Sequence, residues 1–128
     1  MVVPKPLNRP MRFATQVHVN SLFWVSSLSE AEAGVTRRIL EDLTPFFDRI
    51  GLPYQCLCPL TARSFTEFLG ALARQTSQGS RPILHLDLHG SVNGGIRISA
   101  SGETVSWPHL LEMLRTINIA SGNNLCVI

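Results

Sequence analysis

The chain has 128 residues, the usual size of one domain, so we expect a single core. The hydrophobic share of 45% and the charged share of 16% exclude disorder, collagen-like repeats and coiled coil. Eleven Lys and Arg against nine Asp and Glu leave a net charge of +2, and the basic residues are scattered. A nucleic-acid site needs a stripe of positive charge, and a membrane span needs roughly 18 consecutive apolar residues. Neither is found, so we expect neither nucleic acid nor membrane as a partner.

The first ten residues contain three prolines and two basic residues, without the continuous apolar segment of a signal peptide. We therefore predict an extended Pro-rich arm over residues 1–12 and one α/β domain over residues 13–128. The chain has three cysteines, Cys56, Cys58 and Cys126, a small and odd number. This count argues against a disulfide framework and favours a reducing cytoplasm. Cys56-x-Cys58 lacks the second ligand pair that a zinc site needs, so we expect no metal and no cofactor.

In the first half of the chain, β-favouring residues between Phe13 and Val25 predict a strand, interrupted at Asn20-Ser21. A helix follows from the acidic segment 29–32 to Gly51. Its apolar residues recur at spacings of four, four, three and four and form one stripe along the helix: Val35, Ile39, Leu43, Phe46 and Ile50. Pro45 is expected to kink this helix or to start a new turn.

The second half of the chain begins with an apolar run at 52–59, which predicts a buried strand. Ser64-x-x-Glu67 has the spacing of a capping box and predicts a helix that ends at 78–80. A strand at 82–90 is followed by a small hairpin, with arms at 96–98 and 104–106. Ser106 caps a last helix with Pro108 in its first turn, and 125–128 forms a short final strand.

This order of elements, with strands that are apolar throughout, predicts an α/β fold. We expect a mostly parallel sheet with helices on both faces. In open α/β sheets the site forms at the carboxyl ends of the strands. Because the chain stops at such an edge after Ile128, we expect the sheet to be incomplete at its C-terminus.

The segment His85-Leu86-Asp87-Leu88-His89-Gly90 is the one constellation that could carry chemistry. On a strand, residues two apart share a face, so both histidines and the aspartate point the same way. One interpretation is a catalytic His89, with Gly90 turning the backbone and presenting an amide to an oxyanion. Another is a divalent-metal site, for which His18 or His109 would have to supply a further ligand. The third is that His85 and Asp87 only form hydrogen bonds between sheet and helix.

After the strand that ends in His89-Gly90 come a Gly-rich loop, a hairpin, an amphipathic helix and, after Asn123-Asn124, a last apolar strand. This order of elements resembles the caspase-like cysteine peptidases of clan CD. The bacterial CHAT branch is the most similar. The resemblance covers residues 13–128, and its specific part is His89-Gly90 with the order of elements that follows. It implies a caspase-like sandwich and peptide-bond cleavage by a Cys-His dyad. His89 would be the general acid and base, and Gly90 an oxyanion donor.

In this family the nucleophilic Cys follows the strand after the His-Gly strand, which places it beyond Ile128. Cys126 lies downstream of His89, but it sits within an apolar strand, where a buried thiol is inert. Cys56 and Cys58 precede His89 on a different strand. We therefore expect the chain to be the His-bearing part of a cysteine endopeptidase acting on a protein or peptide, and inactive alone. The alternative is a non-catalytic α/β module whose sheet a partner polypeptide completes.

Overall fold

The computed structural model describes residues 16–128, so the predicted arm at 1–12 and the first residues of the first predicted strand lie outside the described residues. Six strands and three helices are found within residues 16–128. They follow in the order β1 (Ser21–Ser27), α1 (Glu30–Ile50), β2 (Tyr54–Leu57), α2 (Ala62–Ser77), β3 (Pro82–Ser91), β4 (Gly95–Arg97), β5 (Thr104–Ser106), α3 (Trp107–Ala120) and β6 (Cys126–Val127).

The described strands form one mixed sheet in the order β2-β1-β3-β4-β5, with β6 paired to β3. Strand β1 runs parallel to both β2 and β3, and β6 is also parallel to β3. The hairpin strands β4 and β5 are antiparallel. The predicted α/β class is thus confirmed, and the sheet combines a parallel part with an antiparallel hairpin. Strand β3 joins the two parts, because residues 82–88 pair with β1 while residues 89–91 pair with β4.

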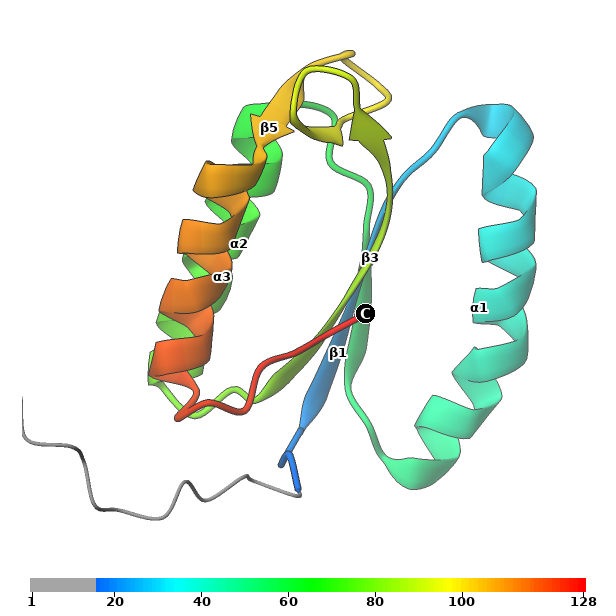
Figure 1. Ribbon diagram of the computed structural model, residues 1–128. Helices are drawn as coiled ribbons and strands as arrows, with labels where there is room; N and C mark the ends of the chain where they lie inside the picture. The colour runs from blue at the N-terminus through cyan, green and yellow to red at the C-terminus, as the bar shows by residue number, and fades with distance from the viewer. Residues whose placement is uncertain (1–15) are drawn as a thin grey trace, which may run out of the picture.

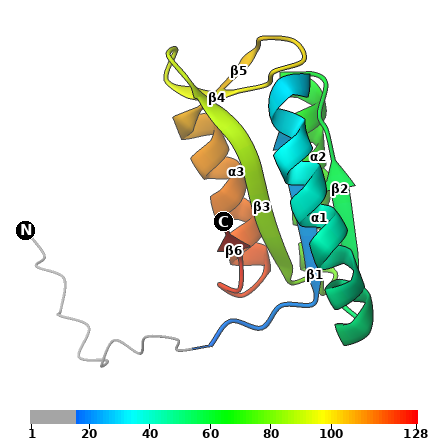
Figure 2. The ribbon, with the colours of Figure 1, turned by 90° about the vertical axis from the view of Figure 1, so that its right-hand side faces the viewer.

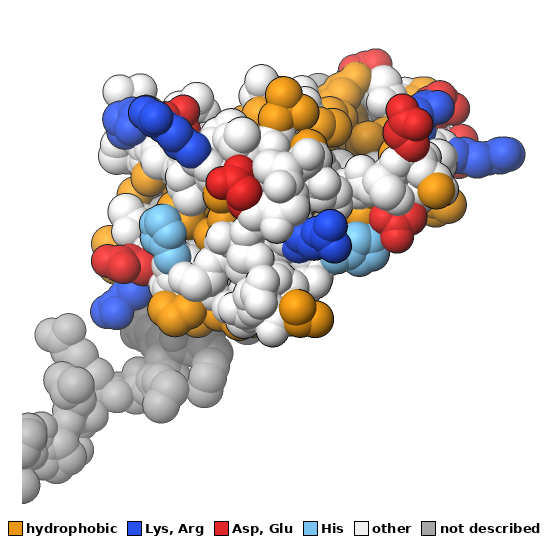
Figure 3. All heavy atoms as spheres, turned by 90° about the horizontal axis from the view of Figure 1, so that it is seen from above, with side chains coloured by type: hydrophobic (Ala, Val, Ile, Leu, Met, Phe, Trp, Pro, Cys, Tyr) orange, Lys and Arg blue, Asp and Glu red, His pale blue; other side chains and the backbone are white. Residues whose placement is uncertain are grey.

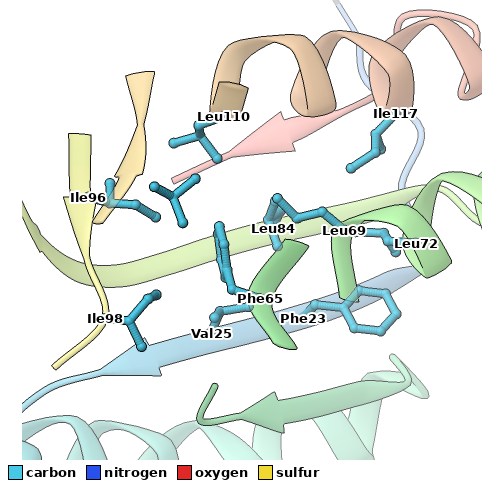
Figure 4. Packing of buried hydrophobic residues seen from close by; sticks show 11 residues of the cluster. Phe23, Val25, Phe65, Leu69, Leu72, Leu84, Ile96, Ile98, Leu110 and Ile117 are labelled. Atoms are coloured by element: carbon cyan, nitrogen blue, oxygen red, sulfur yellow. The ribbon is translucent and has the colours of Figure 1, made fainter. Parts of the chain in front are cut away.

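The helices lie on opposite sides of the sheet strands, with α1 on one side and α2 and α3 together on the other (Figures 1 and 2). The main hydrophobic core fills the space between the sheet and the pair α2 and α3 (Figure 4). Its buried side chains are Phe23, Val25, Phe65, Leu69, Leu72, Leu84, Ile96, Ile98, Val105, Leu110 and Ile117. Period-two alternation directs Leu84 and its neighbours Leu86 and Leu88 to this side, so the polar residues between them face α1.

Local signals determine where the helices begin and end. Ser29 caps α1 and forms a capping box with Glu32, and Gly51 ends the helix in the left-handed conformation at φ 68°. Ser106 caps α3 as predicted. The predicted start of α2 was wrong, because Thr61 and Ser64 form the capping box and the helix begins three residues earlier than Ser64-x-x-Glu67 indicated.

The apolar stripe predicted for α1 does not face the sheet. Thr36 and Phe47 are the buried residues of this helix. The stripe residues Val35, Ile39, Phe46 and Ile50 are exposed, Val35 at 70% of its surface. Strand β2, expected to be buried, lies at the sheet edge with Tyr54–Cys56 exposed. Helix α1 also continues without interruption through Pro45.

Candidate active site

The carboxyl ends of β1, β2 and β3 border a pocket of about 640 Å³. Ser26 and Ser27 come from the end of β1, Cys58 follows β2, and His89 and Gly90 belong to β3. Strand β1 has β2 on one side and β3 on the other, so α1 leads from β1 to one side and α2 leads from β2 back to the other side. This is the arrangement that opens a crevice at the carboxyl edge of an α/β sheet, where ligands bind.

His89 meets a carboxylate in this pocket. Its Nε2 lies 3.0 Å from both Oε1 and Oε2 of Glu32, in the first turn of α1. Because a carboxylate only accepts, Nε2 is the donor of this hydrogen bond, and in the neutral tautomer that the contact favours Nδ1 carries no proton. Both side chains are about half exposed, so a ligand can reach the imidazole. The sequence singled out His89 but not Glu32, whose partner is 57 positions away.

The carboxylate of Glu32 is held by two further contacts at the start of α1. The Ser29 hydroxyl donates to Oε2 at 3.0 Å, and the Ser29 backbone N–H donates to the same oxygen at 3.3 Å. The hydrogen bond from His89, followed by the one from the Ser29 hydroxyl, lowers the pKa of Glu32. Glu32 therefore stays ionised and orients the imidazole, as carboxylates do for histidine bases.

The other two polar residues of the motif point the same way as His89 but have different partners. The Thr36 hydroxyl of α1 donates to the carboxylate of Asp87. His85 stacks on Trp24 of β1, with ring centroids 3.8 Å apart. The contact of Asp87 agrees with the predicted hydrogen bond between sheet and helix, whereas His85 stacks on a neighbouring strand and has no such hydrogen bond among residues 16–128. Among residues 16–128, no group of three His, Cys, Asp or Glu side chains that could hold a metal ion is found.

Gly90 differs from its predicted conformation. We expected the backbone to turn at Gly90, at the end of the predicted strand, but β3 continues through Ser91. Gly90 pairs with Ile96 of β4 and does not have a positive φ. A Cβ at Gly90 would meet only the Gly95 carbonyl oxygen, at 4.0 Å. Gly94, with φ 80°, takes the left-handed conformation in the turn instead.

The structure brings into the pocket two residues that the sequence did not connect with His89. Arg97 of β4 is the direct cross-strand partner of His89, so both side chains lie on the same face. Cys58 is exposed and lines the same pocket. Figure 3 looks down on this end of the molecule and shows a histidine and a basic side chain next to each other, with acidic side chains nearby.

The other two cysteines do not line this pocket. Cys126 is half-buried on β6, opposite Ile83. Cys56 lies on the edge strand β2, where partial burial and then repulsion by Cys58 raise its pKa. The segment from Cys58 to Leu60 also borders a second, mainly apolar pocket of about 480 Å³ against Phe65 and Phe68. The two pockets thus share one wall.

No family model, curated protein or solved structure matches the chain. The resemblance to caspase-like peptidases therefore stays a prediction carried by the residues themselves. Within residues 16–128, no helix is both long enough and apolar enough to cross a bilayer.

Proposed function

We propose that the chain is the His-bearing part of a caspase-like cysteine endopeptidase, with the sheet and its flanking helices forming that family's sandwich. His89 is the general base of the proposed reaction. Its position in a pocket at the carboxyl edge of the sheet, with a carboxylate on Nε2, supports this role. The hairpin and α3 that follow Gly90 agree with the order of elements in the family.

The observation that carries the proposal is the pairing of β6 with β3. Ile83 pairs with Cys126 and Leu84 with Val127, in parallel. Backbone hydrogen bonds join Ile128 to Leu84 and to Leu86, so the same register extends to the last residue. Strand β6 therefore runs toward His89. In a chain that continues in this register, the fourth residue after Ile128 lies opposite His89, and we place the nucleophilic Cys there or close by.

The proposed reaction uses the free imidazole nitrogen twice. Nδ1 of His89 takes the proton of the thiol, and the thiolate attacks the carbonyl carbon of the scissile peptide bond. The C–N bond then breaks, and the leaving amine takes the proton from the imidazolium. Water hydrolyses the thioester that remains, giving the free carboxyl end and the regenerated thiol. Glu32 stays ionised throughout and stabilises the imidazolium.

The test is to sequence the encoding locus past the codon for Ile128 and to assay the longer chain on a peptide library. We expect an in-frame Cys within about ten residues, the span over which a strand of usual length continues. Cleavage should fall by about 10² to 10⁴ in His89→Gln. His109→Gln, on the exposed first turn of α3, is the matched control and should cleave normally.

Two results would overturn the proposal: a stop codon directly after Ile128, or cleavage that His89→Gln leaves unchanged. The 128-residue chain by itself should hydrolyse no peptide. Turnover by this chain that Cys58→Ser removes would identify Cys58 as the nucleophile and refute its placement after Ile128.

The second candidate function is a non-catalytic interaction module, and the exposed stripe of α1 favours it. Two copies of α1 packed antiparallel would place Val35 against Ile50 and Ile39 against Phe46, because these pairs are symmetric about the same point of the helix. Light scattering over a wide concentration range should then show dimers that Ile39→Glu abolishes. A monomer at all concentrations excludes self-association through α1.

A further inference from the structure

Two cysteines at the edge of the sheet project from the same side of the chain. Cys56 lies on the edge strand β2, Leu57 ends this strand, and Cys58 follows it directly. Leu57 packs against the main hydrophobic core, so period-two alternation directs its two neighbours to the other side of the strand. Pro59 favours an extended conformation of the residue before it. Both thiols are exposed and free, so one ligand can reach the two together.

The spacing of these two thiols is too wide for a disulfide bond and fits an ion held between two sulfurs. Two residues of strand rise about 6.6 Å, whereas a disulfide needs Cβ atoms about 3.8 Å apart. Closing that gap would break the register in which Cys56 pairs with Trp24 of β1. Two metal–sulfur bonds of about 2.3 Å in line span about 4.6 Å, so each sulfur has to lean only about 1 Å toward the other. Strand β2 can therefore keep its pairing while both thiolates hold one ion.

The number of ligands selects the ion. Structural zinc is held by four side chains, and iron–sulfur clusters need four ligands as well. In the part of the chain that the structure describes, no third His, Cys, Asp or Glu side chain joins the two thiols in a group that could hold such a metal. Thiolates favour soft ions, and Cu(I) is the soft biological ion that two thiolates in line can satisfy. The pair thus lacks the ligands for zinc and has those for Cu(I).

A cation between the two sulfurs also relieves a repulsion. Burial and, secondly, the charge of Cys58 raise the pKa of the Cys56 thiol, so the two groups lie within electrostatic reach of each other. A monovalent cation bound between the two thiolates replaces this repulsion by attraction to a shared positive charge.

We propose that Cys56 and Cys58 together bind one Cu(I) ion, each thiolate supplying one ligand of a linear complex. Binding forms two Cu–S bonds and releases the two thiol protons to solvent, while copper and sulfur keep their oxidation states. The inference does not depend on the proposed peptidase function, because neither His89 nor a peptide takes part in it.

The experiment is an anaerobic titration of the reduced 128-residue chain with Cu(I), in competition with the coloured chelator bicinchoninate. We expect each chain to withdraw one Cu(I) from the chelator, and X-ray absorption of the loaded chain to show two sulfur neighbours of copper. Cys56→Ser and Cys58→Ser should each weaken binding more than about 100-fold, because either change removes one of the two ligands. An excess of Zn²⁺ should not displace the copper.

Cys126→Ser is the matched control, because it removes a thiol on β6, which β1 and β3 separate from β2. It should keep both the affinity and the stoichiometry. Cys56 and Cys58 are exposed, so their Ser variants should unfold at the same denaturant concentration as the original chain. Tight binding that survives in either of these variants, or that Cys126→Ser abolishes, overturns the inference. One ion per two chains, or a third sulfur neighbour, would assign the copper to a contact between copies and refute a site within one chain.

Discussion

Thr36 of α1 donates a hydrogen bond to the carboxylate of Asp87 on β3, one helical turn from the pair of Glu32 with His89. Four residues of helix rise about 6 Å, and two residues of strand rise about 6.6 Å. Helix α1 and strand β3 therefore run in opposite directions and are joined by two successive side-chain contacts, Thr36 with Asp87 and Glu32 with His89. They fix the position of α1 along β3, and through it the position of Glu32 beside His89.

The substitution Thr36→Val tests the hydrogen bond from Thr36 to Asp87. Thr36 is buried and Asp87 half-buried, so loss of the hydroxyl leaves a partly buried carboxylate without its donor at unchanged side-chain volume. We expect the free energy of unfolding to fall by about 1–3 kcal/mol in chemical denaturation. Thr66→Val, whose hydroxyl bonds only to a carbonyl of its own exposed turn, should change it by less than about 0.5 kcal/mol. Equal effects at both sites would contradict the role of Asp87.

The pKa of Glu32 tests the contact between Glu32 and His89. Since the hydrogen bonds from His89 and Ser29 lower this pKa, the interaction stabilises the fold above the ordinary pKa of a glutamate and is lost as pH falls through the lowered value. A carbon-13 titration of the side-chain carboxyl should give a midpoint below that of the denatured chain. His89→Gln should move the midpoint upward, because it removes the largest cause. If His89→Gln leaves the midpoint unchanged, the pair of Glu32 with His89 does not form in solution.

Gly95 and Gly90, five residues apart in the same hairpin, should respond very differently to alanine. A Cβ at Gly95 would lie 1.9 Å from the carbonyl oxygen of Val105, inside the backbone of β5, whereas a Cβ at Gly90 has only a contact at 4.0 Å. We expect Gly95→Ala to cost about 4 kcal/mol or more in thermal or chemical unfolding, or to detach the hairpin. Gly90→Ala should stay within about 1 kcal/mol of the original chain. Similar stabilities of the two variants would refute the packing of β4 on β5.

Alkylation tests the neighbourhood of Cys56. Burial, and secondly the charge of Cys58, raise the pKa of the Cys56 thiol. Because the thiolate is the reactive form, the rate of Cys56 modification by iodoacetamide should rise at higher pH in the folded chain than in the denatured chain. Cys58→Ser removes the repulsion and should shift this profile part of the way back. Mass spectrometry of the labelled peptide gives both rates, and coincident folded and denatured profiles would contradict the burial.

Elements marked by local residue patterns could be predicted from the sequence. The cap Ser106, the acidic first turn of α1, the C-terminal Gly51 and the strand that carries His89 all depend on neighbours within a few residues. The face that a helix buries depends on tertiary packing, which is why the strongest apolar spacing of α1 failed to identify its buried side. The buried residue Thr36 faces a polar row of β3 and has no apolar signal.

The site was predictable only in part for the same reason. His89 stood out because a polar residue ended an apolar strand. Glu32 looked like an ordinary acidic residue in a first helical turn, and no local pattern linked it to His89. Arg97 lies opposite His89 because of the pairing register of β3 with β4. A turn one residue longer would have changed this register, so the sequence did not predict where Arg97 lies.

The walls of the His89 pocket are built in two different ways. On one wall, β3 and β4 share a continuous ladder of backbone pairs, and Ser99 is bonded to Ser27 at the end of β1. The facing segment from Cys58 to Leu60 follows the edge strand β2 and separates the two pockets. A bulky ligand can widen the pocket at lower cost by displacing this segment than by breaking the ladder. Adaptation to ligands of different size should therefore occur at Cys58–Leu60, while His89 and Arg97 keep a constant spacing.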